Sequence, residues 1–145
     1  MGGIMAITGT HFVRVLRAAL HICRHHWPRV KERMEVRRQA LKLRYWGHRH
    51  ESTDTALDLS YESIKAMPGS GVYELRLDDE IGGMRNIRVI FLLPPTSWVA
   101  ASWTKPLPVI WLLDVLSKKS NEWKLHQIER FWAAREVVKE RFYSP

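Results

Sequence analysis

The chain has 145 residues, of which 46% are hydrophobic, with a formal net charge of +8 and a single cysteine. This length suits one domain with a core that needs neither metal nor disulfide bonds, and the lone cysteine excludes an internal disulfide. No apolar run approaches the roughly 18 residues of a membrane span and no signal-peptide pattern opens the chain, so we expect a cytoplasmic protein without a membrane partner.

The charge is arranged in blocks along the chain. Residues 1–50 carry 11 Lys or Arg and two acidic residues. Residues 51–80 carry two Lys or Arg and eight acidic residues, and residues 81–145 carry ten Lys or Arg and five acidic residues. Such blocks indicate a polyanionic partner for the basic parts, or an acidic partner protein. Charge alone does not separate these two interpretations.

Two amphipathic helices are predicted in the first third of the chain. Apolar residues recur at helical spacing over 11–23, with basic residues on the other face. Pro28 interrupts the pattern and begins a second helix that ends near Gly47. We expect its buried stripe to consist of Val30, Met34, Leu41 and Tyr45. Its exposed basic face is expected to carry Arg33, Arg37, Lys42 and Arg44.

Strands are predicted in the middle of the chain, after a polar stretch at 48–58 and a short helical or irregular piece at 60–67. Runs rich in β-branched and aromatic residues, bounded by turn residues, indicate strands at about 71–77, 86–93 and 108–116. Gly82-Gly83 suits a hairpin between the first two. A closing helix runs from about Ser120 to Phe142. Helices, then strands, then a helix predict an α+β fold.

Three segments in this order resemble the RelE/ParE superfamily of toxins, nearest to its phage-derived HigB-like branch. They read Ser-Gly-Val-Tyr-Glu-Leu-Arg from Ser70, Ile-Arg-Val-Ile-Phe from Ile87, and Leu-Asp-Val-Leu-Ser-Lys-Lys-Ser from Leu113. The match covers about residues 59–142. It implies a RelE-like fold, with N-terminal helices packed on a small twisted antiparallel sheet and a C-terminal helix. It also implies the toxin of a type II toxin–antitoxin system.

The resemblance further implies an endoribonuclease that cleaves mRNA on the ribosome, inhibits translation, needs no cofactor and is neutralised by a cognate antitoxin, expected to be a helix-turn-helix protein. The domain would span 34–145, with 1–33 as a basic, partly helical extension. This extension has three readings: an RNA-facing arm, the product of an upstream start codon, or a transit peptide. Asp114 and Leu116 depart from the family, whose members often carry His and Phe there.

Two other functions remain open. One is a ParE-like toxin that binds DNA gyrase without nuclease chemistry. The other is a non-catalytic module that binds RNA or protein on the same scaffold. The Lys118-Lys119 ending favours the nuclease, whereas the lack of a plain His/Asp site weakens it.

Metal-free RNA cleavage requires a base for the 2′-hydroxyl, cations for the phosphoryl oxygens and an acid for the leaving oxygen. Arginine matches phosphate geometry, and a crowded lysine can transfer protons. The candidate catalytic residues, carried over from the resemblance, are Arg76, Arg88, Lys118, Lys119 and Tyr143. The candidate RNA-binding residues are Arg33, Arg37, Arg44, Arg85 and Trp103.

Each candidate also has an ordinary structural role to weigh. Arg76 can pair with an acid, Lys118-Lys119 can be a solvated pair, and Tyr143 can be an exposed end of the chain. Glu74 is expected to orient an arginine. The close spacing of His21, Cys23, His25 and His26 suits a metal, but Cys23 falls on the apolar stripe, so we expect no metal site.

Overall fold

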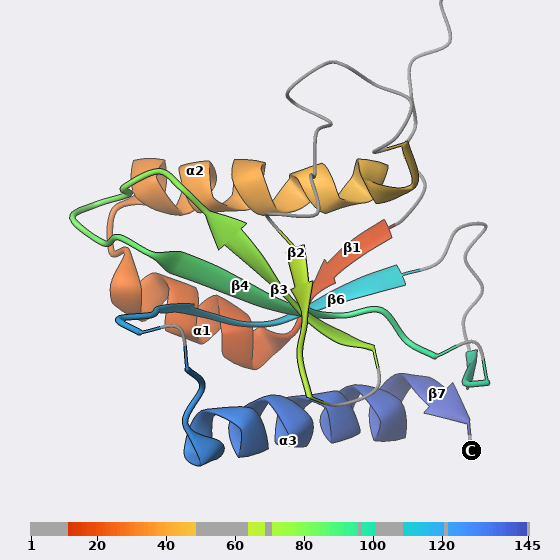
Figure 1. Cartoon of the computed structure of the whole chain (residues 1–145). Helices are drawn as coiled ribbons and strands as arrows, with labels where there is room; N and C mark the ends of the chain where they lie inside the picture. Colours follow the sequence, from red (N-terminus) through yellow and green to blue (C-terminus); the bar gives the residue numbers. More distant parts are fainter. Residues whose placement is uncertain are drawn as a thin grey trace, which may run out of the picture.

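The structure is a computed structural model, and it describes residues 12–48, 64–68, 71–95, 97–100, 109–120 and 122–144. It has the expected α+β class, with a five-stranded sheet between helices (Figure 1). The elements are β1 (Phe12–Val15), α1 (Arg17–His26), α2 (Val30–Ala40), the 3-10 helix η2 (Leu41–His48), β2 (Ile64–Ala66), β3 (Val72–Leu77), β4 (Ile87–Leu92), β5 (Val99–Ala100), β6 (Val109–Ser117), α3 (Leu125–Phe142) and β7 (Tyr143–Ser144).

The main sheet has the strand order β1-β6-β4-β3-β2. The three predicted strands are confirmed as β3, β4 and β6, and they pair antiparallel as expected. The sheet is nevertheless mixed, because β1 pairs parallel with β6. The piece at 60–67 contributes the edge strand β2, and β5 pairs with β7 in a separate two-stranded sheet.

The start of the chain differs from the predicted helix over 11–23. Residues 12–15 form a strand, and the backbone of Leu16 continues its pairing by donating a hydrogen bond to Leu112. Phe12 and Val15 sit three residues apart, a spacing that suits a helix face, but Phe-Val-Arg-Val is also a strand-forming run. The free edge of β6 decides the outcome, and the helix begins only at Arg17.

The expected domain boundary at 33/34 falls inside α2, which is continuous from Val30 to Ala40. The preceding β1 is part of the main sheet, and Trp27 is fully buried in the core. Residues 12–33 therefore belong to the same folded unit as the strands. The reading of this segment as an appended arm is corrected from residue 12 onward.

Each face of the sheet carries its own core. On the α2 side, Trp27, Val36 and Leu43 pack with inward residues of β3, β4 and β6. On the other side, Phe131 and Val138 of α3 pack with the opposite faces of the same strands. Figure 1 shows α2 and α3 on opposite sides of the sheet, as these two clusters require. No helix in the described residues is long and apolar enough to span a membrane.

The face of α2 that packs on the sheet is not the predicted one. Val36, Ala40 and Leu43 are buried, whereas Val30 and Met34 are exposed. The helix therefore has two apolar stripes, and the strands select the one with small and branched residues. Two residues of the stripe expected to be buried, Val30 and Met34, are left uncovered.

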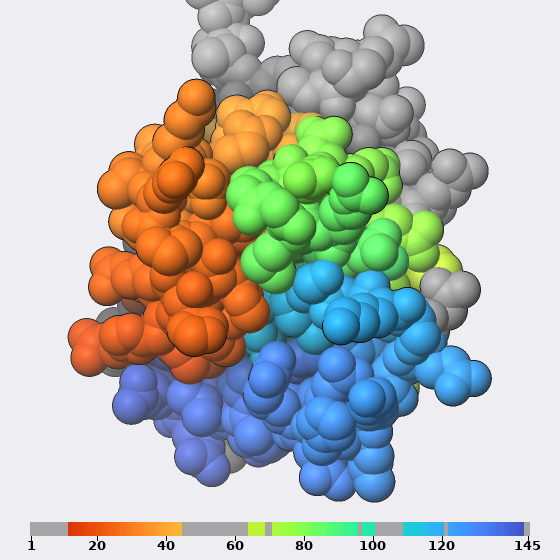
Figure 2. Space-filling model, turned by 90° about the vertical axis from the view of Figure 1, so that its left-hand side faces the viewer, coloured from red at the N-terminus to blue at the C-terminus, as the bar shows by residue number. Residues whose placement is uncertain are grey.

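The hairpin between β3 and β4 contacts the residue that follows α1, Trp27. Gly82 and Gly83 both have positive φ, and Ile81 pairs with Met84 across the turn. The indole of Trp27 donates a 2.8 Å hydrogen bond to the carbonyl of Ile81. In Figure 2 the hairpin lies between the N-terminal helices and the segment that leads into α3.

Candidate phosphate-binding site on the sheet

Four charged side chains gather on one face of the sheet. Glu74 and Arg76 alternate with Leu75 and Leu77, which face the α2-side core, so the two charged residues face the α3 side. Arg88 of β4 is the direct cross-strand partner of Arg76. Lys118 follows β6, and its Nζ lies 3.9 Å from Oε2 of Glu74. We call Glu74, Arg76, Arg88 and Lys118 the basic cluster.

The side chains of the basic cluster are mostly buried, yet several of their polar atoms lack hydrogen-bond partners among the described residues. The exposed fractions of Glu74, Arg88 and Lys118 are only 4%, 7% and 7%. Glu74 Oε2, Arg76 Nε and Arg88 Nε are buried without a hydrogen-bond partner among the described residues. Within the described part of the chain, the one hydrogen bond that Arg88 donates is a 3.3 Å bond to the carbonyl of the adjacent Ile87. Buried, unpaired polar groups cost free energy, which a bound anion would offset.

The electrostatic balance of the basic cluster is positive. Arg76, Arg88 and Lys118 contribute three cations against the one carboxylate of Glu74. Two like charges directly opposite in a sheet repel each other. Burial lowers the pKa of Arg88, and the neighbouring Arg76 lowers it further. A phosphate oxygen between the two guanidinium groups would remove this repulsion.

Lys118 has the environment of a proton-transfer group. Burial lowers the pKa of its ammonium group, Glu74 partly opposes this shift, and Arg88 adds to it. Nζ also lies 4.0 Å from the ring centre of Trp123, whose indole packs edge-on against Phe131. The lysine is thus held between a carboxylate and an aromatic face. A lysine with a lowered pKa is a better base near neutral pH.

Trp123 is not among the residues singled out from the sequence, yet its ring lies against Lys118. It lies two residues before α3, in the short segment that crosses from β6 to the helix. Its closeness to Lys118 in sequence was the available signal. Its orientation over the ammonium group depends on Phe131, which no local pattern reveals.

The other two catalytic candidates do not join the basic cluster. Lys119 is exposed, next to the buried Lys118. Tyr143 is buried and its hydroxyl accepts a 3.0 Å hydrogen bond from the indole of Trp111. Trp111 precedes Lys118 by seven residues along β6, which places Tyr143 about 20 Å from the basic cluster. Burial also raises the pKa of Tyr143, so its hydroxyl keeps its proton.

The RNA-binding candidates do not form one surface with the basic cluster. Arg33, Arg37 and Arg44 belong to α2 and η2, which cover the opposite face of the sheet. Arg33 donates to the carbonyls of Trp27 and Pro28, and Arg44 donates to that of Leu41.

The remaining two candidates lie elsewhere. Arg85, in the hairpin, pairs with Glu80 at 3.0 Å, and its side chain is exposed. Trp103 lies outside the described residues. Among the described residues, the structure therefore gathers Arg76, Arg88 and Lys118, and it leaves the other candidates apart from them.

Asp114, one of the departures from the family, has a structural explanation. It lies where the pairing of β4 and β6 shifts register, and it is buried. Its carboxylate accepts a 2.7 Å hydrogen bond from Arg130 of α3 and a 2.8 Å hydrogen bond from the amide of Val115. Burial raises the pKa of Asp114, and Arg130 opposes that shift. This carboxylate fastens α3 to the sheet and lies outside the basic cluster.

No group of three or more His, Cys, Asp or Glu side chains within the described part of the chain is arranged to hold a metal ion. Comparisons of the chain with protein-family models, with curated proteins and with solved structures found no match.

Proposed function

We propose that this protein is the toxin of a toxin–antitoxin pair, an endoribonuclease that cleaves mRNA through the basic cluster. The observation that supports it is the convergence of Arg76, Arg88 and Lys118 on one sheet face. These residues come from the three segments that resemble the toxin family. Two arginines suited to phosphate, next to a lysine with a lowered pKa, supply two of the three functions that metal-free cleavage needs.

In this mechanism Arg76 and Arg88 bind the non-bridging oxygens of one phosphodiester. Neutral Lys118 removes the proton from the neighbouring 2′-hydroxyl, and the 2′-oxygen attacks phosphorus. The bond from phosphorus to the 5′-oxygen breaks, and that oxygen takes a proton from water. The products are a 2′,3′-cyclic phosphate and a 5′-hydroxyl. Glu74 positions Lys118 and limits the repulsion among the cations.

The proposed partners are mRNA on the ribosome and an antitoxin protein of the helix-turn-helix type, in the cytoplasm. The gyrase-binding toxin and the non-catalytic binding module are the competing functions. Neither of them requires a lysine with a lowered pKa beside two phosphate-binding arginines. The lowered pKa of Lys118, next to Arg76 and Arg88 on the same face, therefore favours the nuclease.

The test is induced expression in a bacterial host, followed by primer extension on cellular mRNA. We expect growth arrest and new cleavage sites with the natural chain, and neither with Arg76→Met or Lys118→Met. Arg38→Met is the matched control, because Arg38 is an exposed arginine of α2 that pairs with Glu35. Growth arrest with intact mRNA and DNA damage would favour the gyrase-binding toxin. Growth without arrest would favour the binding module.

A further inference from the structure

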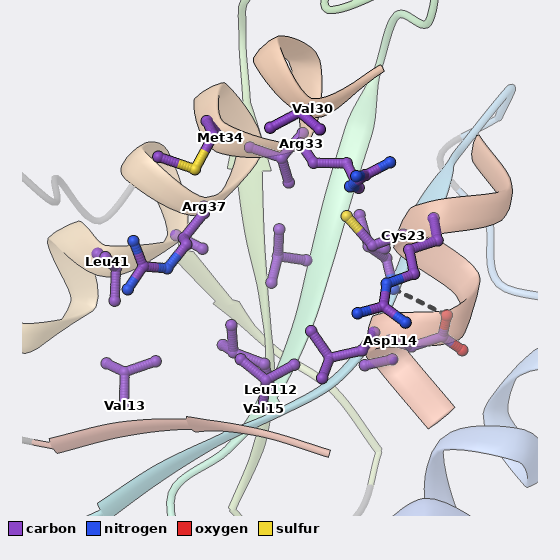
Figure 3. Close-up of a pocket in the computed structure, with 17 residues that line it drawn as sticks. Val13, Val15, Cys23, Val30, Arg33, Met34, Arg37, Leu41, Leu112 and Asp114 are labelled. Carbon is purple, nitrogen blue, oxygen red and sulfur yellow. Dashed lines mark hydrogen bonds between the residues drawn. The ribbon is translucent and has the colours of Figure 1, made fainter. Parts of the chain in front are cut away.

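A groove lies between α1, α2 and the edge of the sheet, on the side away from the basic cluster. Its volume is about 330 Å³, within the range of real binding sites. Figure 3 shows Val30 and Met34 of α2 on one side, Cys23 of α1 on another, and Val13 of β1 along the bottom. The lining is mostly apolar, with the carboxylate of Asp114 at one end.

The uncovered stripe of α2 forms one wall of this groove. Val30 and Met34 are four residues apart, so they share one face of α2, and Leu41 at the start of η2 also lines the groove. Val30 is 63% exposed and Met34 is 54% exposed, and Leu20 on α1 is 43% exposed. Large apolar side chains gathered on both walls of an open groove mark an interaction site rather than a solvated surface.

The rim of the groove is positively charged. Arg24 of α1 and Arg33 and Arg37 of α2 line it. α1 contains no acidic residue. α2 has two acidic residues, Glu32 and Glu35, and neither of them lines the groove. The carboxylate of Glu35 accepts hydrogen bonds from Arg38 and Gln39, which lower its pKa to about 2. An apolar floor with a basic rim complements an apolar stripe flanked by acids.

A protein fits this surface better than RNA does. None of the described residues that line the groove is aromatic, whereas single-stranded RNA is usually held by bases stacked on aromatic rings. An amphipathic helix in such a groove uses apolar anchors at helical spacing. Leu20 of α1 and Val30 and Met34 of α2 are exposed apolar residues of the lining that such anchors can contact.

We propose that the groove between α1 and α2 binds an amphipathic helix of a partner protein, with apolar anchors on the floor and acidic residues against Arg24, Arg33 and Arg37. The proposal rests on the groove alone and does not require RNA cleavage. The groove and the basic cluster lie on opposite faces of the sheet, so a bound helix leaves the basic cluster open.

The probe is a fluorescein-labelled synthetic peptide of about 18 residues, long enough for a marginal helix, with leucines at helical spacing and flanking glutamates. Its control is a scrambled peptide of the same composition. Binding to the full chain is followed by fluorescence anisotropy. Cys23 is the only cysteine and lines the groove, so its alkylation by iodoacetamide reports occupancy independently.

We expect the amphipathic peptide to bind, to slow alkylation of Cys23 and to weaken with added salt. Met34→Glu places a charge on the floor and should weaken binding at least about tenfold. Leu125→Glu is the matched control, because Leu125 is 67% exposed on α3 and outside the groove. Arg37→Glu should weaken binding of this peptide and improve binding of one with lysines in place of the glutamates.

Three results would overturn the proposal. Equal binding of the scrambled peptide would show that the contact is not a helix in a groove. Unchanged alkylation of Cys23 under saturating peptide would place the peptide elsewhere. Stronger protection of Cys23 by a short RNA than by the peptide would make the groove a nucleic-acid surface. None of these results depends on whether the basic cluster cleaves RNA.

Discussion

Arg76 and Arg88 lie directly opposite each other on neighbouring antiparallel strands, and each has a buried Nε without a hydrogen-bond partner among the described residues. Two guanidinium groups in this arrangement repel each other, and their Nε–H groups have lost water without gaining a partner. A fold that only needed stability would place apolar side chains here. The pair therefore makes this face of the sheet a candidate anion site.

Replacing one arginine should remove activity without removing stability. Arg76→Met keeps the aliphatic bulk and eliminates the repulsion, so we expect its unfolding free energy to be equal to that of the natural chain or higher by about 1 kcal/mol. Glu74→Met removes the only carboxylate of the basic cluster and should cost about 3–5 kcal/mol. Urea unfolding measures both. A strongly destabilised Arg76→Met chain would mean that this arginine has a structural partner.

Inorganic phosphate should stabilise the natural chain. A ligand that binds only the folded state at a hundred times its dissociation constant adds about 2.7 kcal/mol. We expect the melting temperature to rise with phosphate but not with sodium chloride of equal ionic strength. Arg76→Met should lose this response, and Arg38→Met should keep it. An equal response in both variants would remove the basic cluster as the anion site.

The rate of RNA cleavage should depend on the ionisation of Lys118. Because burial lowers its pKa below 10.5, neutral lysine appears at a lower pH than in a free side chain. The rate should rise with pH with an apparent pKa below 10.5, and Lys118→Arg should abolish this rise, since arginine stays protonated. Single-turnover cleavage across pH measures this. A rise that survives in Lys118→Arg would assign the base to another group.

The same shift has a consequence for stability. Between the pKa in the folded state and 10.5 the unfolded chain binds more protons at this lysine. The contribution of Lys118 to the unfolding free energy therefore increases, and the folded state becomes more stable, as pH rises through that interval. Urea unfolding of the natural chain and of Lys118→Arg across this interval provides the check.

The two glycines of the hairpin should respond differently to alanine. Both have positive φ, so either substitution costs about 1 kcal/mol in backbone strain. A Cβ on Gly82 would also lie 2.9 Å from the ring of buried Trp27, whereas a Cβ on Gly83 has no neighbour within 4 Å. Gly82→Ala should therefore be the more destabilising change in denaturant unfolding. Equal effects would show that Trp27 and the hairpin adjust freely.

A chain that begins at Met34 should not fold. It would lack β1, α1 and the fully buried Trp27, whose loss alone is expected to cost about 3–5 kcal/mol. It would also leave the β6 edge unpaired. Far-UV circular dichroism and gel filtration are the measurements. A folded, active chain of this length would support a domain that begins at Met34, as the family resemblance implies.

The local pattern was sufficient for the central strands and for the presence and end of the last helix, which begins at Leu125 and not near Ser120 as predicted. β3, β4 and β6 consist of β-branched and aromatic runs between turn residues, so their type and bounds were predicted closely. It was insufficient for Phe12–Val15, whose spacing suits both a helix and a strand, and for α2, which has two apolar stripes. In both cases the partner element decides, and it lies far away in sequence.

The sequence by itself determined that Arg76 and Arg88 are cations within strands of alternating side chains, and that Lys118 is a cation at the end of a strand. Side-chain alternation along a strand is a local property, so it can be read without a structure. Only the tertiary structure decided that Arg76 faces Arg88, that Lys118 meets Glu74 and Trp123, and that Tyr143 lies far away. Strand register and helix placement depend on long-range pairing and packing, which no short stretch of residues encodes.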